Sequence, residues 1–219
     1  MNRYLLFLFL FVMGYVVESA AQSGKGQFLL EEFQDGTVYY RDGRRFVVPL
    51  NYNVLLKRFF FLDKGDNNQM KEFAEKELVT FITIGSRRFL YDKKEIKEVL
   101  QLDPPVLVEY RGVTKDKGKK AGYGGTSSTA AIDNYSGFFA DGTYHALEDE
   151  AVAIDVSRIL KKYMVLSKGK QKFFVNASDF LKIYPQHKEV LKEYIKANKI
   201  QFSVTEDVVN LYNYALSLN

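Results

Sequence analysis

The stretch from Val38 to Arg111 constrains the fold most, because turn residues repeatedly interrupt its short runs of β-branched and aromatic residues. The runs are residues 38–40, 44–48, 55–62, 79–84, 87–91, 95–102 and 106–110. Connections this short leave no room for the crossover helices that parallel strands need, so neighbouring strands should pair mainly antiparallel. The stretch predicts a meander of about seven or eight strands. We expect residues 28–33 to start the sheet and residues 70–77 to form a short helix or a loop.

The turn residues of this stretch predict particular backbone geometry. Asp42-Gly43 is a strong hairpin signal because both residues accept the positive φ angles of a tight primed turn, and Gly85 marks a second hairpin. Pro49 lacks an amide hydrogen and should lie at a strand end or face an open sheet edge. The nearly unbroken apolar run 55–62 is typical of a strand buried on both faces.

The first 21 residues have the organisation of a secretory signal peptide. Arg3 supplies the positive end, residues 4–17 the apolar core, and Ser19-Ala20-Ala21 a small-residue cleavage site. The apolar core is shorter than the roughly 20 residues that a membrane-spanning helix needs. We therefore expect a mature chain that begins near Gln22 and has no transmembrane span. An uncleaved anchor is the alternative.

The composition narrows the class of protein. Of 219 residues, 47% are hydrophobic and 15% aromatic, which favours a packed core over disorder. The chain has no cysteine, which excludes disulfides, thiol catalysis, thiolate metal sites and bacterial lipoprotein processing. An exported protein without disulfides is more typical of a bacterial envelope than of a small animal module. The net charge of +4 is too low to indicate nucleic-acid binding.

Residues 112–142 differ sharply in composition from the meander, with seven glycines and many serine, threonine and lysine residues. Connections longer than roughly 12–15 residues are usually functional or disordered. The segment is either a mobile solvated loop or a segment that becomes ordered against a partner. Its aromatic residues favour the second interpretation, and the predicted binding residues are Tyr123, Tyr135, Phe138, Phe139 and Tyr144.

Two phosphate-binding motifs can be tested against this segment, and both fail. A Walker-type loop needs glycine where Val113 stands and serine or threonine where Lys120 stands. The dinucleotide-binding pattern needs a third glycine at Ser127 and a surrounding parallel βαβ unit. The lysines between residues 115 and 120 fit a solvated loop better than an anion site, since export removes most nucleic acid from reach. We expect no cofactor and no nucleic-acid partner.

One group of residues could support acid–base chemistry: His145, Glu148, Asp149, Glu150 and Asp155. Paired carboxylates serve glycoside hydrolysis, but three consecutive acidic residues cannot all face one site. The chain also lacks the G-x-S-x-G motif of serine hydrolases. We therefore predict no catalytic residue and no metal ligand, and a hydrolase that uses this acidic group remains an alternative.

The C-terminal third predicts a hairpin followed by helices. Residues 163–166 and 171–175 flank a turn at Ser167–Lys170. The first predicted helix is short, is capped by Asn176 or Ser178 and ends near Tyr184. The second covers residues 188–197 and ends at a left-handed Asn198. The third follows a capping box formed by Ser203 and Glu206. Their apolar stripes should pack against the sheet or the hairpin.

These elements predict an α+β protein. It comprises an antiparallel, sheet-rich meander body over residues 22–111, a Gly/Ser/Lys-rich loop over 112–142, and a late hairpin with C-terminal amphipathic helices over 143–219. The last part either packs with the body as one domain or stands apart.

Four sets of segments carry a family resemblance. They are Glu32-Phe33-Gln34-Asp35-Gly36-Thr37-Val38; Leu50-Asn51-Tyr52; Tyr123-Gly124-Gly125-Thr126-Ser127-Ser128; and Phe180 to Asn198 followed by Glu206 to Tyr214. Together they resemble uncharacterised exported proteins of Bacteroidota-type Gram-negative bacteria. The resemblance implies an envelope location, either periplasmic or associated with the cell surface, and assigns no active-site residue.

The function that fits these observations best is non-enzymatic: an exported cell-envelope protein that binds an envelope protein partner. Binding would bury aromatic side chains and pair backbone groups at an open sheet edge. One alternative is a protein that binds a small apolar ligand or a glycan in a sheet concavity lined by phenylalanine and tyrosine. The other is the hydrolase near His145.

Overall fold

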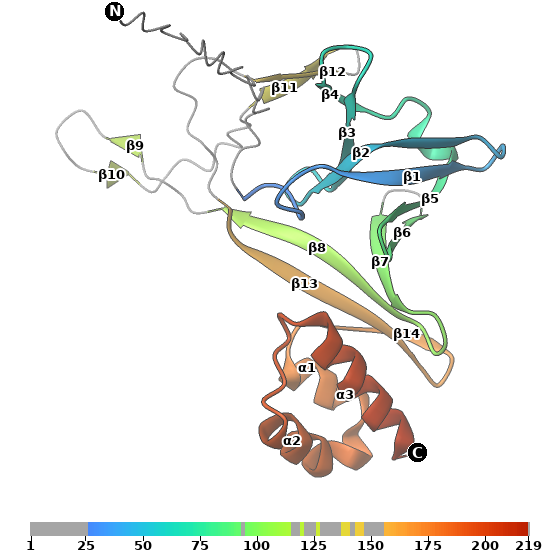
Figure 1. Ribbon diagram of the computed structural model, residues 1–219. Helices are drawn as coiled ribbons and strands as arrows, with labels where there is room; N and C mark the ends of the chain where they lie inside the picture. The colour runs from blue at the N-terminus through green and yellow to red at the C-terminus, as the bar shows by residue number, and fades with distance from the viewer. Residues whose placement is uncertain are drawn as a thin grey trace, which may run out of the picture.

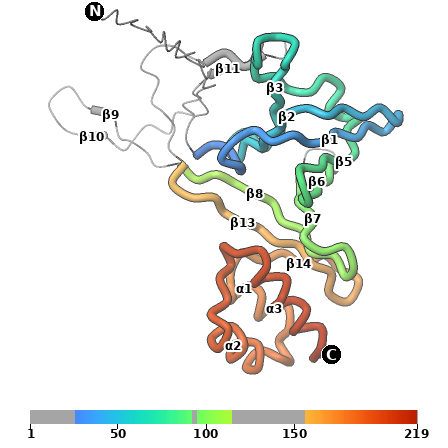
Figure 2. Tube along the Cα trace, in the orientation of Figure 1, coloured from blue at the N-terminus to red at the C-terminus, as the bar shows by residue number. Residues whose placement is uncertain are grey.

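The computed structural model describes residues 26–92, 95–114, 119–120, 126–127, 137–140, 143–146 and 156–218 (Figures 1 and 2). Within these ranges the chain forms a twelve-stranded sheet, a separate two-stranded pair and three α-helices. The strands are β1 (Gln34–Tyr40), β2 (Arg45–Asn53), β3 (Arg58–Asp63), β4 (Gln69–Glu72), β5 (Val79–Ile84), β6 (Arg87–Asp92), β7 (Glu95–Gln101), β8 (Val106–Thr114), β9 (Lys119–Lys120), β10 (Thr126–Ser127), β11 (Gly137–Ala140), β12 (Thr143–Ala146), β13 (Val156–Ser167) and β14 (Lys170–Phe174). The helices are α1 (Ala177–Ile183), α2 (Lys188–Ala197) and α3 (Thr205–Ser217), with 3₁₀ turns at Lys76–Leu78 and Pro185–His187.

The large sheet has the strand order β11-β12-β4-β3-β2-β1-β5-β6-β7-β8-β13-β14. Its neighbouring strands pair antiparallel, so the prediction of a sheet-rich antiparallel protein is confirmed. Most neighbours follow one another along the chain, because short turns favour pairing with the next strand. The exceptions are the pairs β1–β5, β4–β12 and β8–β13, the last of which joins strands on either side of residues 115–155.

The sheet curves so strongly that its N-terminal strands come back against β8 (Figures 1 and 2). The amide of Gly112 on β8 donates a hydrogen bond of 2.9 Å to the carbonyl of Val54, in the turn after β2. A Cβ atom at Gly112 would stand 2.7 Å from a methyl carbon of Leu55, so a larger residue here would require the Leu55 side chain to move. Beside it, the Lys57 ammonium pairs with the Glu109 carboxylate at 2.9 Å.

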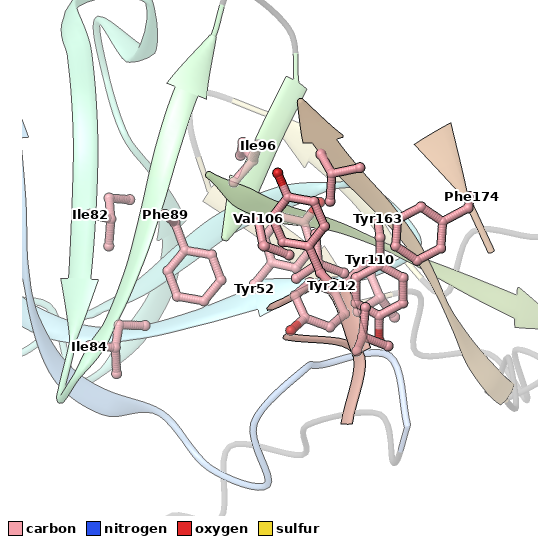
Figure 3. Packing of buried hydrophobic residues seen from close by; sticks show 14 of the residues in the cluster. Tyr52, Ile82, Ile84, Phe89, Ile96, Val106, Tyr110, Tyr163, Phe174 and Tyr212 are labelled. Carbon is pink, nitrogen blue, oxygen red and sulfur yellow. The ribbon is translucent and has the colours of Figure 1, made fainter. Parts of the chain in front are cut away.

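The inner face of the curved sheet holds the core. One row of directly paired inward positions crosses seven neighbouring strands, from β1 to β14. The row is Val38, Ile82, Phe89, Glu98, Val108, Tyr163 and Phe174, and Figure 3 shows several of its members. All of them are buried, and Glu98 is the one charged member of the row. Side chains alternate between the two faces of a strand, so a consistent register aligns such a row.

The C-terminal helices cover the inner face of β13 and β14. The ring of Phe180 on α1 meets Phe174 edge-on at 5.0 Å, and the Tyr212 hydroxyl on α3 donates to the Leu166 carbonyl at 3.0 Å. The Tyr163 hydroxyl donates to the Phe202 carbonyl, before α3, at 2.8 Å. The expectation that the helices pack on the sheet and hairpin is confirmed. Across the described residues, no helix has both the length and the apolar character to cross a membrane.

The ends of the helices differ in part from the sequence predictions. Asn176 is the residue that caps α1, since its side chain accepts the Asp179 amide at 3.0 Å. Asn198 after α2 has a φ of −91°, and the left-handed residue is Lys199, at φ 51°. The Asn198 side chain instead donates to the carbonyl of Tyr194 at 3.0 Å, which also accepts the Asn198 backbone amide.

The predicted capping box before α3 is wrong. The N-cap residue is Val204, and no side chain caps the helix. Asp207 instead turns back to accept the Gln201 amide at 2.8 Å, and the carbonyl of Ser203 accepts the Lys161 ammonium. Glu206 and Asp207 still place negative charge in the first turn, where the helix dipole favours it.

Three strand predictions need correction near the N-terminus. In the first hairpin only Gly43 has a positive φ, of 90°. The backbone carbonyl of Tyr40 accepts the Gly43 amide at 3.1 Å, and the Tyr40 amide donates to the Arg44 carbonyl at 3.0 Å. These contacts make a three-residue loop ending in a left-handed glycine, not a two-residue primed turn. The run 55–62 becomes a strand only from Arg58, because Lys57 is left-handed, at φ 55°. Pro49 lies inside β2, opposite Asp35, just beyond the last β2–β3 pair.

Two segments adopt other structure than expected. Residues 28–33 contribute a single bridge between Phe28 and Asn53, not a strand. Residues 70–77 contain most of β4 and part of a 3₁₀ turn, not an α-helix or a plain loop.

Candidate functional site

The predicted aromatic binding residues are only partly within the described chain. Tyr123 and Tyr135 lie outside it. Phe138 and Phe139 belong to β11 and Tyr144 to β12, and the backbone register sets Phe139 opposite Tyr144. Because the described part of the chain does not extend to these side chains, their binding role stays a prediction.

The predicted acidic group also falls mainly outside the described residues. The residues outside the described chain are Glu148, Asp149, Glu150 and Asp155. His145 lies on β12, where its backbone pairs with that of Phe138. In the described ranges, no three or more histidine, aspartate or glutamate side chains gather in a way that could hold a metal ion.

A charged cluster that the sequence did not predict lies on the inner face of the sheet. Arg87 on β6 donates two hydrogen bonds to Glu98 on β7, from Nε to Oε1 at 2.7 Å and from Nη2 to Oε2 at 2.8 Å. The hydroxyl of Tyr110 on β8 donates to the same Oε2. Arg87 Nη2 also donates to the Tyr110 hydroxyl at 3.4 Å, which closes a three-membered network.

Strand alternation places the members of this network together. Arg87 and Phe89 are two residues apart and share a face, and Phe89 pairs directly with Glu98. Glu98 pairs with Val108, which shares a face with Tyr110. The network therefore lies next to the apolar row, and the Glu98 side chain is only 7% exposed.

Lys161 on β13 connects this network to the helices. It pairs with Tyr110 in the sheet register, its ammonium lies 5.8 Å from the centre of the Tyr110 ring, and it donates to the Ser203 carbonyl before α3. Burial lowers the pKa of Lys161, an effect that Glu98 partly opposes. Burial, followed by the charge of Glu98, raises the pKa of the Tyr110 hydroxyl well above its usual range.

The network suits a structural role better than a reactive one. A bidentate arginine–carboxylate pair neutralises both charges and occupies both carboxylate oxygens. Glu98 has no unoccupied oxygen with which to act as a base, and Tyr110 donates its proton to Glu98. The cluster links β6, β7 and β8 and, through Lys161, the start of α3.

Aromatic rings fill the inner face next to this cluster. The Tyr52 and Phe59 rings are 5.1 Å apart, and Phe59 meets Phe89 edge-on at 5.0 Å (Figure 3 shows Tyr52 and Phe89). All three side chains are at most 2% exposed. The protein's own side chains therefore fill this part of the inner face.

The outer face carries a different arrangement, which we call the aromatic–arginine patch: Tyr39 on β1, Arg45 on β2, Phe81 on β5 and Arg88 on β6. Tyr39 and Phe81 are directly paired, and their rings stack with centres 4.1 Å apart. The Arg45 guanidinium lies 5.2 Å from the centre of the Tyr39 ring, and the Arg88 guanidinium 5.6 Å from that of Phe81. An arginine thus flanks each ring of the stacked pair.

The two arginines of the patch differ from Arg44, Arg58 and Arg87 in their partners. Arg44, Arg58 and Arg87 each pair with a carboxylate at 2.9 Å or less. Among the described residues, neither Arg45 nor Arg88 lies within ion-pair distance of a carboxylate, and both are exposed. Apolar groups border the patch, since Val47 is 71% and Leu90 36% exposed. The patch thus combines aromatic and apolar surface with two uncompensated positive charges.

No protein-family model matches this chain. No curated protein and no solved structure matches it either. A functional inference must therefore be built from the residues and contacts themselves.

Gly36, within the first resembling segment, has a structural role. A Cβ atom at this position would stand 2.5 Å from the Thr83 carbonyl oxygen and 2.7 Å from a methyl carbon of Leu50. Only glycine lets β1 pass between β2 and β5 at this point.

Asn51, in the second resembling segment, fixes the chain that precedes the sheet. Its side-chain oxygen accepts the amides of Leu30, at 3.1 Å, and Tyr52, at 2.9 Å. Its side-chain nitrogen donates to the carbonyls of Leu30 and Glu32 at 3.0 and 3.2 Å. Asn51 is fully buried, so these contacts hold residues 26–33 over the outer face of β2.

Proposed function

We propose that this chain is an exported, non-enzymatic cell-envelope protein that binds a protein partner through the aromatic–arginine patch. The observation that carries the proposal is the stacked Tyr39–Phe81 pair flanked by two arginines without carboxylate partners. Tyrosine and arginine are enriched at protein–protein interfaces, where they combine apolar area with directional hydrogen bonding.

The rigidity of the patch supports this role. The stacked rings project from adjacent, directly paired strands of a twelve-stranded sheet, so little side-chain freedom would be lost on binding. The exposed side chains of Val47 and Leu90 extend the apolar surface on both sides. A partner that supplies carboxylates would find two arginine side chains already ordered over aromatic rings.

The proposed location rests on the sequence. Residues 1–21 have the pattern of a cleavable export signal, and the chain has no cysteine. With the resemblance to exported Bacteroidota-type proteins, these features support an α+β envelope protein in the periplasm or at the cell surface.

The two alternative functions have weaker support. Binding of a small ligand or glycan inside the sheet would require space that Tyr52, Phe59 and Phe89 occupy. A hydrolase would depend on residues near His145, most of which lie outside the described chain.

The test is position-specific photo-crosslinking in intact cells of a bacterium that exports the protein. A photoreactive residue at position 47 or 90 borders the patch, and one at position 196, on the exposed side of α2, serves as a distant control. We expect the same partner to crosslink from 47 and from 90 but not from 196. The combined substitution Arg45→Gln and Arg88→Gln should strongly reduce this crosslink.

The matched control is Arg111→Gln, because Arg111 is an exposed arginine on β8 outside the patch. It should leave the crosslink unchanged. Equal crosslinking from all three positions, or products that persist in the double arginine variant, would reject the patch as the binding surface.

A further inference from the structure

The hairpin β13–β14 is uniformly basic. Residues 156–175 contain six lysine or arginine residues and no aspartate or glutamate, whereas the whole chain has 31 basic and 27 acidic residues. The six are Arg158, Lys161, Lys162, Lys168, Lys170 and Lys172. In the described chain, no carboxylate lies within ion-pair distance of Lys168, Lys170 or Lys172. The tip of the hairpin therefore carries concentrated, uncompensated positive charge.

β14 is the last strand of the sheet, and one of its sides pairs with no strand in the described chain. The turn residues Lys168 and Gly169 have φ angles of 51° and 70°, as in a primed two-residue turn. In such a turn the amide of Lys170 donates to the carbonyl of Ser167. The backbone N–H and C=O groups of successive strand residues point to opposite sides, so those of Gln171 and Phe173 point away from β13. Within the described residues, no backbone group of another element bonds Gln171 or Phe173 on that free side.

The side chains of β14 divide between the two faces. Lys170 and Lys172 share a face with Ser167 and Val165, their respective partners on β13, whereas Phe173 lies on the opposite face, paired with Met164. Phe173 is 46% exposed and has the Lys162 ammonium 4.7 Å from its ring centre. A strand placed beside β14 would meet Lys170 and Lys172 on one face and, on the other, the exposed Phe173 ring with the Lys162 ammonium against it.

The charge pattern discriminates between possible occupants of this edge. A second copy pairing through β14 would bring lysines against lysines, and like charges on paired strands are destabilising. Lysines at an open edge protect against such self-association. An acidic strand meets no such barrier. Lipids and nucleic acids are anionic too, but they lack the peptide groups that the free backbone of Gln171 and Phe173 can pair with.

We propose that the open edge of β14 binds an extended acidic segment of a partner polypeptide, which adds to the sheet as a further strand. The acidic side chains of this segment face Lys170 and Lys172, and its apolar side chains lie on Phe173. Backbone pairing supplies affinity, and the alternation of the side chains supplies selectivity. This site is separate from the aromatic–arginine patch and does not depend on the function proposed for it.

The probe is a terminally blocked peptide of about nine residues in which glutamate and valine alternate, added to the purified protein. We expect saturable binding in isothermal titration calorimetry. A peptide of the same composition in scrambled order, or one with lysine in place of glutamate, should bind at least about tenfold more weakly. Methylating the backbone nitrogens on one edge of the peptide should abolish binding, because those amides can no longer pair with β14.

Variants of the protein test the same edge. Gln171→Pro removes an outward amide without breaking the β13–β14 ladder and should weaken binding at least about tenfold. Lys170→Glu with Lys172→Glu should reverse the preference toward the lysine peptide. The matched control Lys196→Glu, an exposed charge reversal on α2, should leave binding unchanged. Circular dichroism spectra should be unchanged in all three.

Equal binding of the N-methylated and unmodified peptides would overturn the proposal, because it would show charge attraction without strand pairing. The absence of peptide binding together with lysine-dependent binding to phosphatidylglycerol vesicles would overturn it in favour of a membrane surface. Dimers that form through β14 in sedimentation experiments would overturn it in favour of a second copy of the chain.

Discussion

Arg87 and Glu98, on adjacent strands, bind each other through two hydrogen bonds of 2.7 and 2.8 Å on the face of the sheet that is otherwise apolar. The pair interrupts a row of hydrophobic residues that crosses seven strands. Its effect on stability depends on whether one partner or both are removed, because a buried charge is costly mainly when it is left unpaired.

Replacing Glu98 with glutamine should destabilise the fold by about 3 kcal/mol. The substitution removes the negative charge that balances Arg87 and replaces one acceptor oxygen with an NH2 donor, so either Arg87 or Tyr110 loses a partner. Arg87 keeps some access to water, with 28% of its side chain exposed. Urea unfolding measures the effect. The double variant Arg87→Met with Glu98→Leu removes both charges and should recover most of the loss. If the double variant were less stable than Glu98→Gln, the pair would be net stabilising.

Gly36→Ala should destabilise the protein by about 3 kcal/mol or more. The added methyl group would stand 2.5 Å from a backbone oxygen of β5, which cannot move without shifting the strand. Gly65→Ala is the matched control, because the nearest neighbour of its Cβ is an Asp63 carboxylate oxygen at 3.3 Å, which can rotate away. Similar midpoints for the two variants in urea unfolding would contradict the proposed close approach of the strands.

Asn51→Ala should release the chain before the sheet at a cost of about 2 kcal/mol, since it leaves buried backbone groups unpaired. We expect faster amide exchange at Leu30, together with faster proteolysis of residues 26–33. Asn210→Ala, at an exposed position of α3, is a suitable control. An unchanged exchange rate at Leu30 would show that other contacts hold this segment.

The stability of the protein should fall as pH rises above 10. Burial raises the pKa of Tyr184 to about 12, against 10.0 for an ordinary tyrosine, and also raises that of Tyr52 and Tyr163. The unfolded chain therefore loses phenolic protons near pH 10, while the folded chain keeps them, so unfolding becomes progressively more favourable between about pH 10 and 12. Lys161, whose pKa burial lowers, acts in the opposite direction but is a single group.

Urea unfolding at several pH values, with tyrosinate absorbance as a second signal, measures this dependence. Tyr184→Phe should reduce its slope. Constant stability from pH 9 to 12 would be inconsistent with buried, protonated tyrosines.

The sequence predicts the local elements of this fold well, because neighbouring residues decide them. Glycine turns produce the hairpins at Gly85 and Gly169, and apolar stripes produce α2 and α3. The predicted capping box fails because the N-cap residue of α3 is Val204 and not Ser203, whose carbonyl instead accepts the distant Lys161 ammonium.

The candidate sites depend on register between distant strands. Tyr39 and Phe81 are 42 positions apart in the sequence, and the sequence does not show whether either side chain faces the core or the outer face of the sheet. The pairing of β1 with β5 places both on the outer face. Arg87 and Glu98 likewise look like ordinary surface charges in the sequence. A stronger signal was available in the hairpin, where residues 156–175 contain no acidic residue.

Thr114 and Val156 stand opposite each other on β8 and β13, so the chain leaves β8 and enters β13 at neighbouring points. The ladder between these strands holds both ends of the connection together, whatever its length. Doubling the length of a flexible connection costs only about 0.6 kcal/mol. Residues inserted next to Thr114 or Val156 would therefore lengthen the connection without redesigning the ladder between β8 and β13.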